Sequence, residues 1–294
     1  MMKVRGLDHL VLAVKDLDEA GRFYERLGFK VGQRNRHPWG TENRIVQFPG
    51  IFLELITIGA DADRVQPDPK VFSFGGFIKT YLDQQEGFAM LVLASDDAAR
   101  DRQDFLQNDI GDFAPFHFER QGMSPDGKPV TVAFSLAFAR DALAPDIGYF
   151  VCQHHFPENF WSAAAQAHPN HANALTEIAL YAENPADHAE FMSAFTGLRD
   201  YSATSFGLRF ETRGAITILS KPAYHALYGP QDLPHRVALA GISVAVPALD
   251  ALSKRFDDQG ISYHHQGHAL VVPASFAHGA CLRFVASSSS DHSA

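Results

Sequence analysis

Residues 7–29, LDHLVLAVKDLDEAGRFYERLGF, give the clearest indication of the fold. Its first part, residues 7–14, is rich in Leu and Val and predicts a β-strand. Asp16 and Glu19 follow with the three-residue spacing of a capping box, which marks the start of a helix. Residues 17–27 then place their apolar side chains on one helical stripe. The stretch therefore predicts a strand followed directly by an amphipathic helix.

The residues after this helix continue the pattern with strands. Gly28 is the expected left-handed stop of the helix, and Phe29 resumes an apolar strand. Apolar runs at 43–48 and 51–58 predict two further strands. The predicted order is strand, helix and three strands, a βαβββ module.

The same order of elements returns three more times along the chain. The copies open at Leu7, Phe88, Leu175 and Leu239, and their helices are expected to end at Gly28, Gly111, Gly197 and Gly260. The spacings from opening residue to glycine are 21, 23, 22 and 21 positions. Four such spacings with one element order predict an α+β fold of four βαβββ modules.

We expect these modules to pair into two domains. The first domain is assigned to residues 1–158, with modules 1–60 and 86–155, and the second to residues 159–286, with modules 173–222 and 236–286. The segment 154–173 is rich in turn formers and is the expected boundary. The low-complexity tail, 287–294, is predicted to be disordered.

Composition excludes several classes of protein. The chain has 294 residues, 46% of them hydrophobic, and a formal net charge of −9, which is a globular composition without the basic surface that nucleic acid requires. No apolar run approaches the ~18 residues of a membrane span. Its two cysteines, Cys152 and Cys281, and an N-terminus without a signal-peptide pattern favour a cytoplasmic location.

The opening stretch and the repeat resemble the vicinal oxygen chelate superfamily, which includes glyoxalase I, methylmalonyl-CoA epimerase, extradiol dioxygenases and the fosfomycin and bleomycin resistance proteins. The segment HPWGTEN, 37–43, followed by LELI, 53–56, resembles its glyoxalase-like domain branch. The resemblance implies that two modules form a U-shaped sheet around a divalent metal. It further implies that the ligands come from the first and last strand of each module.

The resemblance implies that His9 and Glu54 are metal ligands. Strand alternation places His9 on one face with Leu7, and Asp8 on the other. Glu54 lies in an apolar strand, where a buried carboxylate has to be paired, protonated or bound to metal. Pairing with Arg44 is the alternative to metal binding.

The third ligand is expected from the end of module two. Met90 overlays His9 and is a poor ligand, whereas Cys152 is aligned opposite Glu54 and His154 lies two residues further on the same face. We favour His154 over Cys152, which gives the set His9, Glu54 and His154; otherwise the histidine merely begins the linker. Nitrogen and oxygen ligands suit zinc, iron, manganese, cobalt or nickel.

The substrate is expected to lie beside these ligands. Glu54 is the candidate catalytic base, and the candidate substrate-binding residues are His37, Asn43, Arg44 and Phe150. For His37 and Asn43 a tight polar turn is an equally good interpretation.

Modules three and four lack this set of ligands. They carry Glu177, Ile218, Gly241 and Arg283 at the positions aligned with the ligands. The second half is therefore interpreted as a degenerate copy that packs, shields or dimerises, and a homodimer is one expected assembly.

These observations favour a metal-dependent enzyme of lyase or isomerase type that polarises a small substrate with two chelating oxygens. One alternative is a metal-free protein that binds a small molecule, as resistance proteins do. The other is an iron-dependent, ring-cleaving dioxygenase. The expected partner is a small-molecule substrate, without nucleic acid or membrane.

Overall fold

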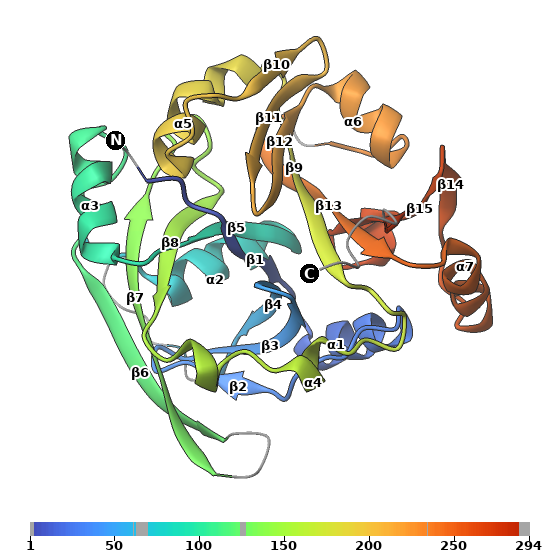
Figure 1. The fold of residues 1–294 in the computed structure, drawn as a ribbon, viewed down its shortest axis with the longest axis horizontal. Coiled ribbons are helices and arrows are strands. Elements are labelled where there is room, and N and C mark those ends of the chain that lie inside the picture. Colours follow the sequence, from blue (N-terminus) through green and yellow to red (C-terminus); the bar gives the residue numbers. More distant parts are fainter. Residues whose placement is uncertain (1–2, 61, 63–69, 124–127, 234, 288–294) are drawn as a thin grey trace, which may run out of the picture.

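Two eight-stranded mixed sheets, each made by two modules, form the molecule (Figure 1). This computed structural model describes residues 3–60, 62, 70–123, 128–233 and 235–287. The predicted α+β fold of paired βαβββ modules is confirmed. The predicted disordered tail lies, apart from Ser287, outside the described residues.

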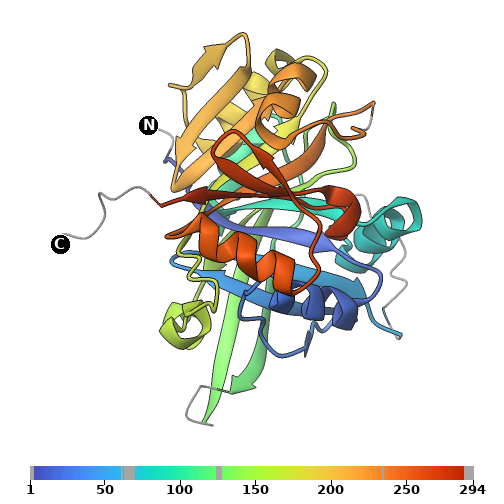
Figure 2. The same cartoon turned by 90° about the vertical axis from the view of Figure 1, so that its right-hand side faces the viewer.

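The first sheet comes from the N-terminal half of the chain. Module one contains β1 (Leu7–Ala13), α1 (Leu17–Arg26), β2 (Asn35–Arg36), β3 (Thr41–Phe48) and β4 (Ile51–Ile58), and α2 (Phe74–Gln84) follows it. Module two contains β5 (Gly87–Ala94), α3 (Ala98–Gln107), β6 (Phe116–Met123), β7 (Pro129–Ala139) and β8 (Gly148–His154). The hairpin of β6 and β7 protrudes from the body of the molecule (Figures 1 and 2).

The second sheet repeats this plan. A linker with η1 (Pro157–Asn159) and α4 (Ala163–Gln166) leads to β9 (Ala174–Tyr181), η2 (Pro185–His188), α5 (Ala189–Thr196), β10 (Ser202–Thr204), β11 (Gly207–Thr212), β12 (Gly214–Leu219) and α6 (Lys221–Tyr228). Module four contains β13 (Ala238–Val246), α7 (Leu249–Asp258), β14 (His264–Gln266), β15 (Ala269–Val272), η3 (Ala274–Phe276) and β16 (Cys281–Ala286).

The first strands of the paired modules lie side by side at the centre of each sheet. The strand orders are β2-β3-β4-β1-β5-β8-β7-β6 and β10-β11-β12-β9-β13-β16-β15-β14. β1 is antiparallel to β5 and parallel to β4, and β5 is parallel to β8. Strands β4, β1, β5 and β8 are therefore the four central strands of the first sheet, and each module contributes two of them.

Helix α1 begins and ends as its sequence predicts. The Asp16 carboxylate accepts hydrogen bonds from the backbone N–H groups of Asp18 and Glu19, which would otherwise have no partner in the first turn. Gly28 follows the helix with φ of 95°, a conformation that favours glycine. No strand begins at Phe29, contrary to the prediction, because the chain first runs toward the short strand β2.

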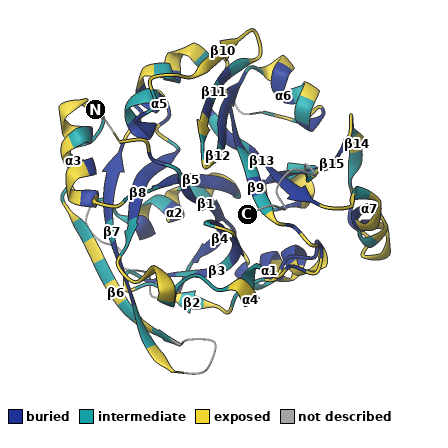
Figure 3. Ribbon diagram, viewed as in Figure 1, coloured by how far each residue is buried: buried dark blue, intermediate teal, exposed yellow. Residues whose placement is uncertain are grey.

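One apolar core lies between the two sheets and belongs to both. It takes side chains from one face of each sheet and from helices α1, α3, α5 and α7. Ring contacts cross it, with centroids 6.1 Å apart for Phe29 and Phe284 and 5.8 Å apart for Phe105 and Phe195. The central strands are accordingly buried along almost their whole length (Figure 3).

The opposite face of each sheet is covered by a helix that the sequence does not predict. Phe74 and Ile78 of α2 pack on the first sheet against Val11 and Met90. Tyr224 and Tyr228 of α6 pack in the same way on the second sheet. None of the described helices is long and apolar enough to cross a membrane.

Candidate metal centre and substrate pocket

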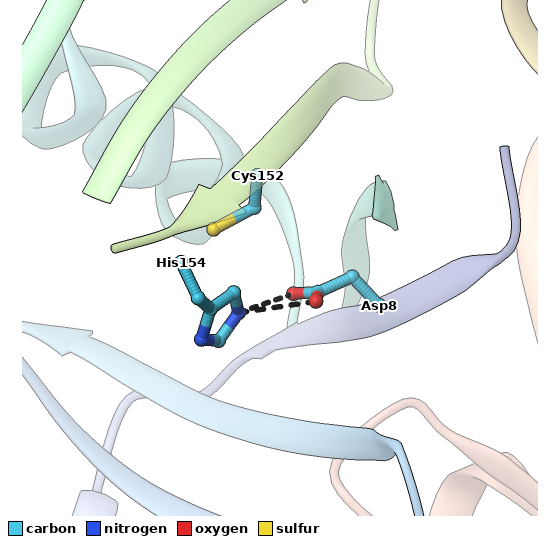
Figure 4. Close-up of side chains that lie close together, drawn as sticks. All are labelled: Asp8, Cys152 and His154. Atoms are coloured by element: carbon cyan, nitrogen blue, oxygen red, sulfur yellow. Dashed lines mark hydrogen bonds and ion pairs between the residues drawn. The ribbon is translucent and has the colours of Figure 1, made fainter. Parts of the chain in front are cut away.

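A β-bulge in β1 brings Asp8 and His9 to the same region. Leu7 pairs with Leu93 of β5 and His9 with Val92, so Asp8 is an extra residue without a partner across the ladder. Leu7 packs in the core between the sheets, while the Asp8 carboxylate is turned toward His154 (Figure 4). The alternation predicted for Leu7, Asp8 and His9 is therefore wrong.

The bulge recurs in all four modules. The extra residue is Asp8 in β1, Ala89 in β5, Thr176 in β9 and Ala240 in β13. Only the first module places a titratable side chain there. The backbone feature thus belongs to the repeated fold, and the carboxylate is specific to module one.

Asp8 is a buried anion held by two imidazoles. Its Oδ2 lies 2.5 Å from Nδ1 of His9, and its Oδ1 lies 3.1 Å from Nε2 of His154. Burial would raise the pKa of Asp8, but the hydrogen bonds and charges of His154 and His9 outweigh it and lower the pKa to about 2. The ionised carboxylate therefore orients both rings.

Cys152 completes a group of three metal-ligating side chains. The donor atoms of Asp8, Cys152 and His154 all lie within 4.8 Å of one another (Figure 4). Burial, together with the charges of Asp8 and Glu54, raises the pKa of the Cys152 thiol well above its ordinary value. Nδ1 of His154 is buried without a hydrogen-bond partner. This group, which we call the Asp8 cluster, is one that could hold a metal ion.

The strand register shows how β8 differs from β4. His9 pairs with Phe52, and Met90 at the matching place pairs with Gly148. Two residues further along each strand stand Glu54 and Phe150, so Phe150, and not Cys152, corresponds to Glu54. Met90 and Phe150 thus occupy two of the four ligand positions that the resemblance implies.

His9 and Glu54 face each other across the floor of a pocket beside the Asp8 cluster. Nε2 of His9 lies 3.9 Å from Oε2 of Glu54, and both side chains are buried. Since Nδ1 of His9 points to the Asp8 anion, Nε2 is the nitrogen directed to Glu54. The structure therefore brings His9 and Glu54 together, with His154 on the other side of Asp8.

The HPWGTEN segment forms one side of this pocket. Asn43 donates a hydrogen bond from Nδ2 to Oε1 of Glu54, and Nε2 of His37 lies 3.7 Å from the same oxygen. Burial lowers the pKa of His37, so the ring is neutral near pH 7 and Nδ1 contacts the Thr41 hydroxyl at 2.9 Å. Both predicted side chains lie at the pocket.

Arg44 lies elsewhere. It pairs with Leu55 in the β3–β4 ladder, one residue out of step with Glu54, so it points to the opposite face of the sheet. Its guanidinium donates to the Asp18 carboxylate at 2.7 Å and to the carbonyl oxygen of Gly32 at 3.1 Å. Neither a substrate carboxylate in this pocket nor Glu54 is within its reach.

Aromatic rings form most of the pocket wall. Phe150 packs edge-on against His9, with centroids 5.6 Å apart, and lies at the pocket as predicted for a substrate contact. Phe52 stacks on the same imidazole at 4.2 Å. The remaining aromatic lining consists of Trp39, Phe74, Phe118, Phe134 and Phe160, and the polar lining includes Arg120.

In the second sheet, side chains of the protein occupy the place that corresponds to the pocket at His9 and Glu54. Glu177 matches His9, but its Oε1 accepts a hydrogen bond from Thr217 at 2.8 Å. Thr217, and not Ile218 as aligned from sequence, matches Glu54 in the register. A Cβ at Gly241 would lie 2.8 Å from the Tyr228 ring, so α6 occupies the place of a ligand there.

A wider groove of about 880 Å³ lies between α2 and the strand β13. It carries Arg140 and Arg236, but within the described residues it contains no group of metal-ligating side chains. The smaller pocket at His9 and Glu54 is therefore the better candidate for chemistry.

Sequence reasoning missed Asp8 and Arg120. An aspartate inside an apolar strand is the same signal that singled out Glu54, yet strict alternation assigned Asp8 to the wrong face. Arg120 lies on the protruding hairpin, and nothing in the local sequence indicates that it reaches the pocket.

The comparisons with known proteins agree with this fold. A family model described as a glyoxalase-like domain matches residues 7–196, and no curated protein sequence matches. A hypothetical protein from Staphylococcus aureus superposes with a TM-score of 0.66 at 11% identity, covering 97% of this chain and 100% of that one. A triple mutant of 4-hydroxymandelate synthase from Streptomyces coelicolor gives 0.58 at 10% identity, with coverage of 97% and 93%.

A third structure contains the fold as part of a longer chain. This xylose isomerase-like TIM barrel/4-hydroxyphenylpyruvate dioxygenase fusion protein gives a TM-score of 0.55 at 10% identity, covering 100% of this chain and 50% of that one. Identities this low show the fold alone. Since the family model matches more than half of the sequence, the chain belongs to the glyoxalase-like domain family of the vicinal oxygen chelate superfamily.

Proposed function

We propose that the protein is a divalent-metal-dependent enzyme of lyase or isomerase type that acts on a small substrate with two chelating oxygens. The observation that carries the proposal is the buried Asp8 cluster, whose carboxylate, thiol and imidazole lie within 4.8 Å of one another beside a pocket. Buried groups of this kind are paired or bind metal.

The chemistry of the donor set fits a metal. Asp8 is ionised, and Nε2 is the His154 nitrogen that lies beside it. Oxygen, sulfur and nitrogen donors suit zinc, iron, cobalt or nickel better than manganese, because thiolate is a soft ligand. Asp8, Cys152 and His154 would hold the ion, and the set His9, Glu54 and His154 stays a prediction that shares one member with it.

The surrounding residues support proton transfer. A divalent ion held by Asp8, Cys152 and His154 would supply Lewis-acid polarisation of a substrate oxygen. Glu54 would accept a proton from the substrate at Oε2 and return it to the product, while Asn43 fixes the other carboxylate oxygen. Asp8 orients His9 so that Nε2 faces Glu54, and the phenylalanine wall excludes water from the site.

Metal analysis of protein purified without added metal tests the proposal. We expect about one equivalent of a transition metal in the wild type, and at least about a tenfold loss of affinity in Cys152→Ser and His154→Ala. The matched control is His155→Ala, because His155 points to the other face, where Nε2 lies 2.8 Å from the Ser135 hydroxyl.

The variants also separate the two ligand sets. Loss of metal in Cys152→Ser with retention in Glu54→Gln identifies the Asp8 cluster, and the reverse identifies the predicted set. Full occupancy in His154→Ala contradicts both. Where the metal is iron, oxygen uptake with a panel of catechols distinguishes a dioxygenase from an isomerase.

A metal-free binding protein is the second candidate, and one observation favours it. The Asp8 carboxylate already accepts hydrogen bonds from His9 and His154, so this anion has partners without a cation. Wild-type protein that contains no metal and binds none of the five candidate ions would support this candidate and contradict the enzyme.

A further inference from the structure

The pocket contains an arginine, Arg120, that forms no ion pair with any residue that the structure describes. Arg120 lies on β6, paired with Val132 of β7, and its half-buried side chain lines the pocket. Among the described residues its one hydrogen bond is to Oδ1 of Asn35, at a long 3.4 Å, and it forms no ion pair. Burial lowers the pKa of this guanidinium, with the charge of Glu54 acting in the opposite direction.

An arginine placed in this way is costly for the protein alone. Removing a guanidinium from water carries a penalty that only a close anion or several good hydrogen bonds offset. Arg44, by comparison, donates to Asp18 at 2.7 Å and to a backbone carbonyl. Arg120 is half-buried, and among the described residues it has only the long hydrogen bond to Asn35 and the charge of Glu54 acting on it.

Two further polar groups at the pocket also lack partners. Nε1 of Trp39 and Oδ1 of Asn43 are buried without hydrogen bonds, and both residues line the pocket. His37 stacks on the Trp39 ring at 4.7 Å and Phe74 at 4.9 Å. An acceptor oxygen of a ligand would satisfy Nε1 of Trp39, whereas Oδ1 of Asn43 is itself an acceptor and requires a hydroxyl or N–H donor.

The wall beside Arg120 is aromatic. Phe118 and Phe134 stack on each other at 5.1 Å on the same hairpin, and Phe160 lies edge-on to Phe134 at 5.9 Å. Aromatic walls of this kind pack flat apolar groups. A guanidinium matches the two oxygens of one carboxylate, and the negative charge of Glu54 in the same pocket disfavours a dianion such as phosphate.

We propose that Arg120 anchors the carboxylate of an aromatic acid, whose ring lies against Phe118, Phe134 and Phe160. The aromatic acid is the substrate class that we assign to the pocket. The assignment rests on the proposed function only where it calls this ligand a substrate. The specificity for an acid comes from the β6–β7 hairpin, whereas the candidate chemistry comes from β1, β4 and β8.

Equilibrium binding tests the proposal without turnover. Both tryptophans, Trp39 and Trp161, lie near the ligand groups, the latter stacked on His154 at 5.9 Å, so their fluorescence reports occupancy. The probes are phenylacetate, its uncharged analogue phenylacetamide, and acetate. We expect wild-type protein to bind phenylacetate at least about tenfold more tightly than either of the other two.

Variants assign the preference to one side chain. Arg120→Gln should bind acid and amide equally, with the amide affinity unchanged, and Arg120→Lys should keep part of the preference. Arg100→Gln, at an exposed arginine of α3, should behave as wild type. Circular dichroism and the melting temperature verify that each variant is folded.

Each outcome is decisive. Equal affinities for acid and amide in the wild type, no binding of phenylacetate, or an acid preference that survives in Arg120→Gln would overturn the proposal. The titrations are repeated after dialysis against a chelator. An acid preference in protein that binds no metal would uphold the role of Arg120 and contradict the metal enzyme, whereas metal binding without that preference would do the reverse.

Discussion

Asp8 joins the two modules of the first sheet through a single carboxylate. It lies on β1 and holds His9 of the same strand and His154 of β8, although 146 positions separate Asp8 from His154. Its pKa of about 2 is below the ordinary value near 4, so its stabilising contribution is complete above about pH 4 and is lost as the pH falls toward 2. At pH 7 the full contribution is present.

The substitution Asp8→Asn should therefore lower the free energy of unfolding at pH 7 by about 2 kcal/mol, since two charge-assisted hydrogen bonds are weakened in a buried place. Urea denaturation followed by circular dichroism measures the change. Asp83→Asn is the control, because that carboxylate is exposed on α2 and, within the described part of the chain, bonds only to Lys79, so its midpoint should equal that of the wild type. An equal midpoint for Asp8→Asn would show that the carboxylate is not part of the fold's stability.

Helices α1 and α7, which correspond to each other in modules one and four, end in different surroundings. Gly28 after α1 and Gly260 after α7 both have positive φ, 95° and 64°. A Cβ at Gly28 would lie 2.6 Å from Cβ of Asn170 in the linker, whereas a Cβ at Gly260 would have no atom within 4 Å. Asn170 also donates its backbone N–H to the carbonyl oxygen of Gly28.

Alanine at these two sites should separate backbone strain from packing. Gly260→Ala should cost about 1 kcal/mol of unfolding free energy, the strain of a left-handed residue. Gly28→Ala should cost about 3 kcal/mol or more, because the linker has to move as well. Thermal and urea denaturation of the pair measure the difference, and equal losses would mean that the linker yields at no cost.

The elements show which parts of the fold local sequence predicts. The Asp16 cap, the Gly28 stop and the four opening strands follow from residue type and spacing, and all are confirmed. The bulge at Asp8 was not predictable, because it depends on how β1 and β5 pair. The pattern of polar and apolar residues along β1 gives no sign of it. Helix α2 was also missed, since Gly75 and Gly76 in its first turn resemble a loop.

The candidate site, too, contains residues that the sequence predicts and residues that it does not. His9, Glu54, His37, Asn43 and Phe150 all line one pocket, and their roles as ligands or substrate contacts stay predictions. Arg44 could not be placed without the register of β3 against β4, which turns it to the other face. Asp8 and Arg120 depend on contacts between strands that are distant in sequence, and only the folded chain brings Arg120 to the pocket and Asp8 to the cluster beside it.

At the scale of the whole molecule, the two halves are joined by more than a linker. The core between the sheets is shared, and buried Arg5 pairs with Asp101 while donating to the carbonyl oxygens of Ala194 and Phe195 in the second half. In the opposite direction, Arg255 of α7 in the second half donates to the carbonyl oxygens at the end of α1 in the first half. The division at residue 158 therefore separates two sheets without separating two cores.

We expect the chain to unfold as one unit, because neither half can bury its face of the shared core alone. In calorimetry, residues 1–294 should show a single transition with equal calorimetric and van't Hoff enthalpies. Fragments 1–158 and 159–286, produced separately, should lack a cooperative melt and a near-ultraviolet dichroism signal, and mixing them should restore both. A fragment 1–158 that melts cooperatively by itself would instead establish the first sheet as an independent domain, with α1 and α3 sufficient to cover it.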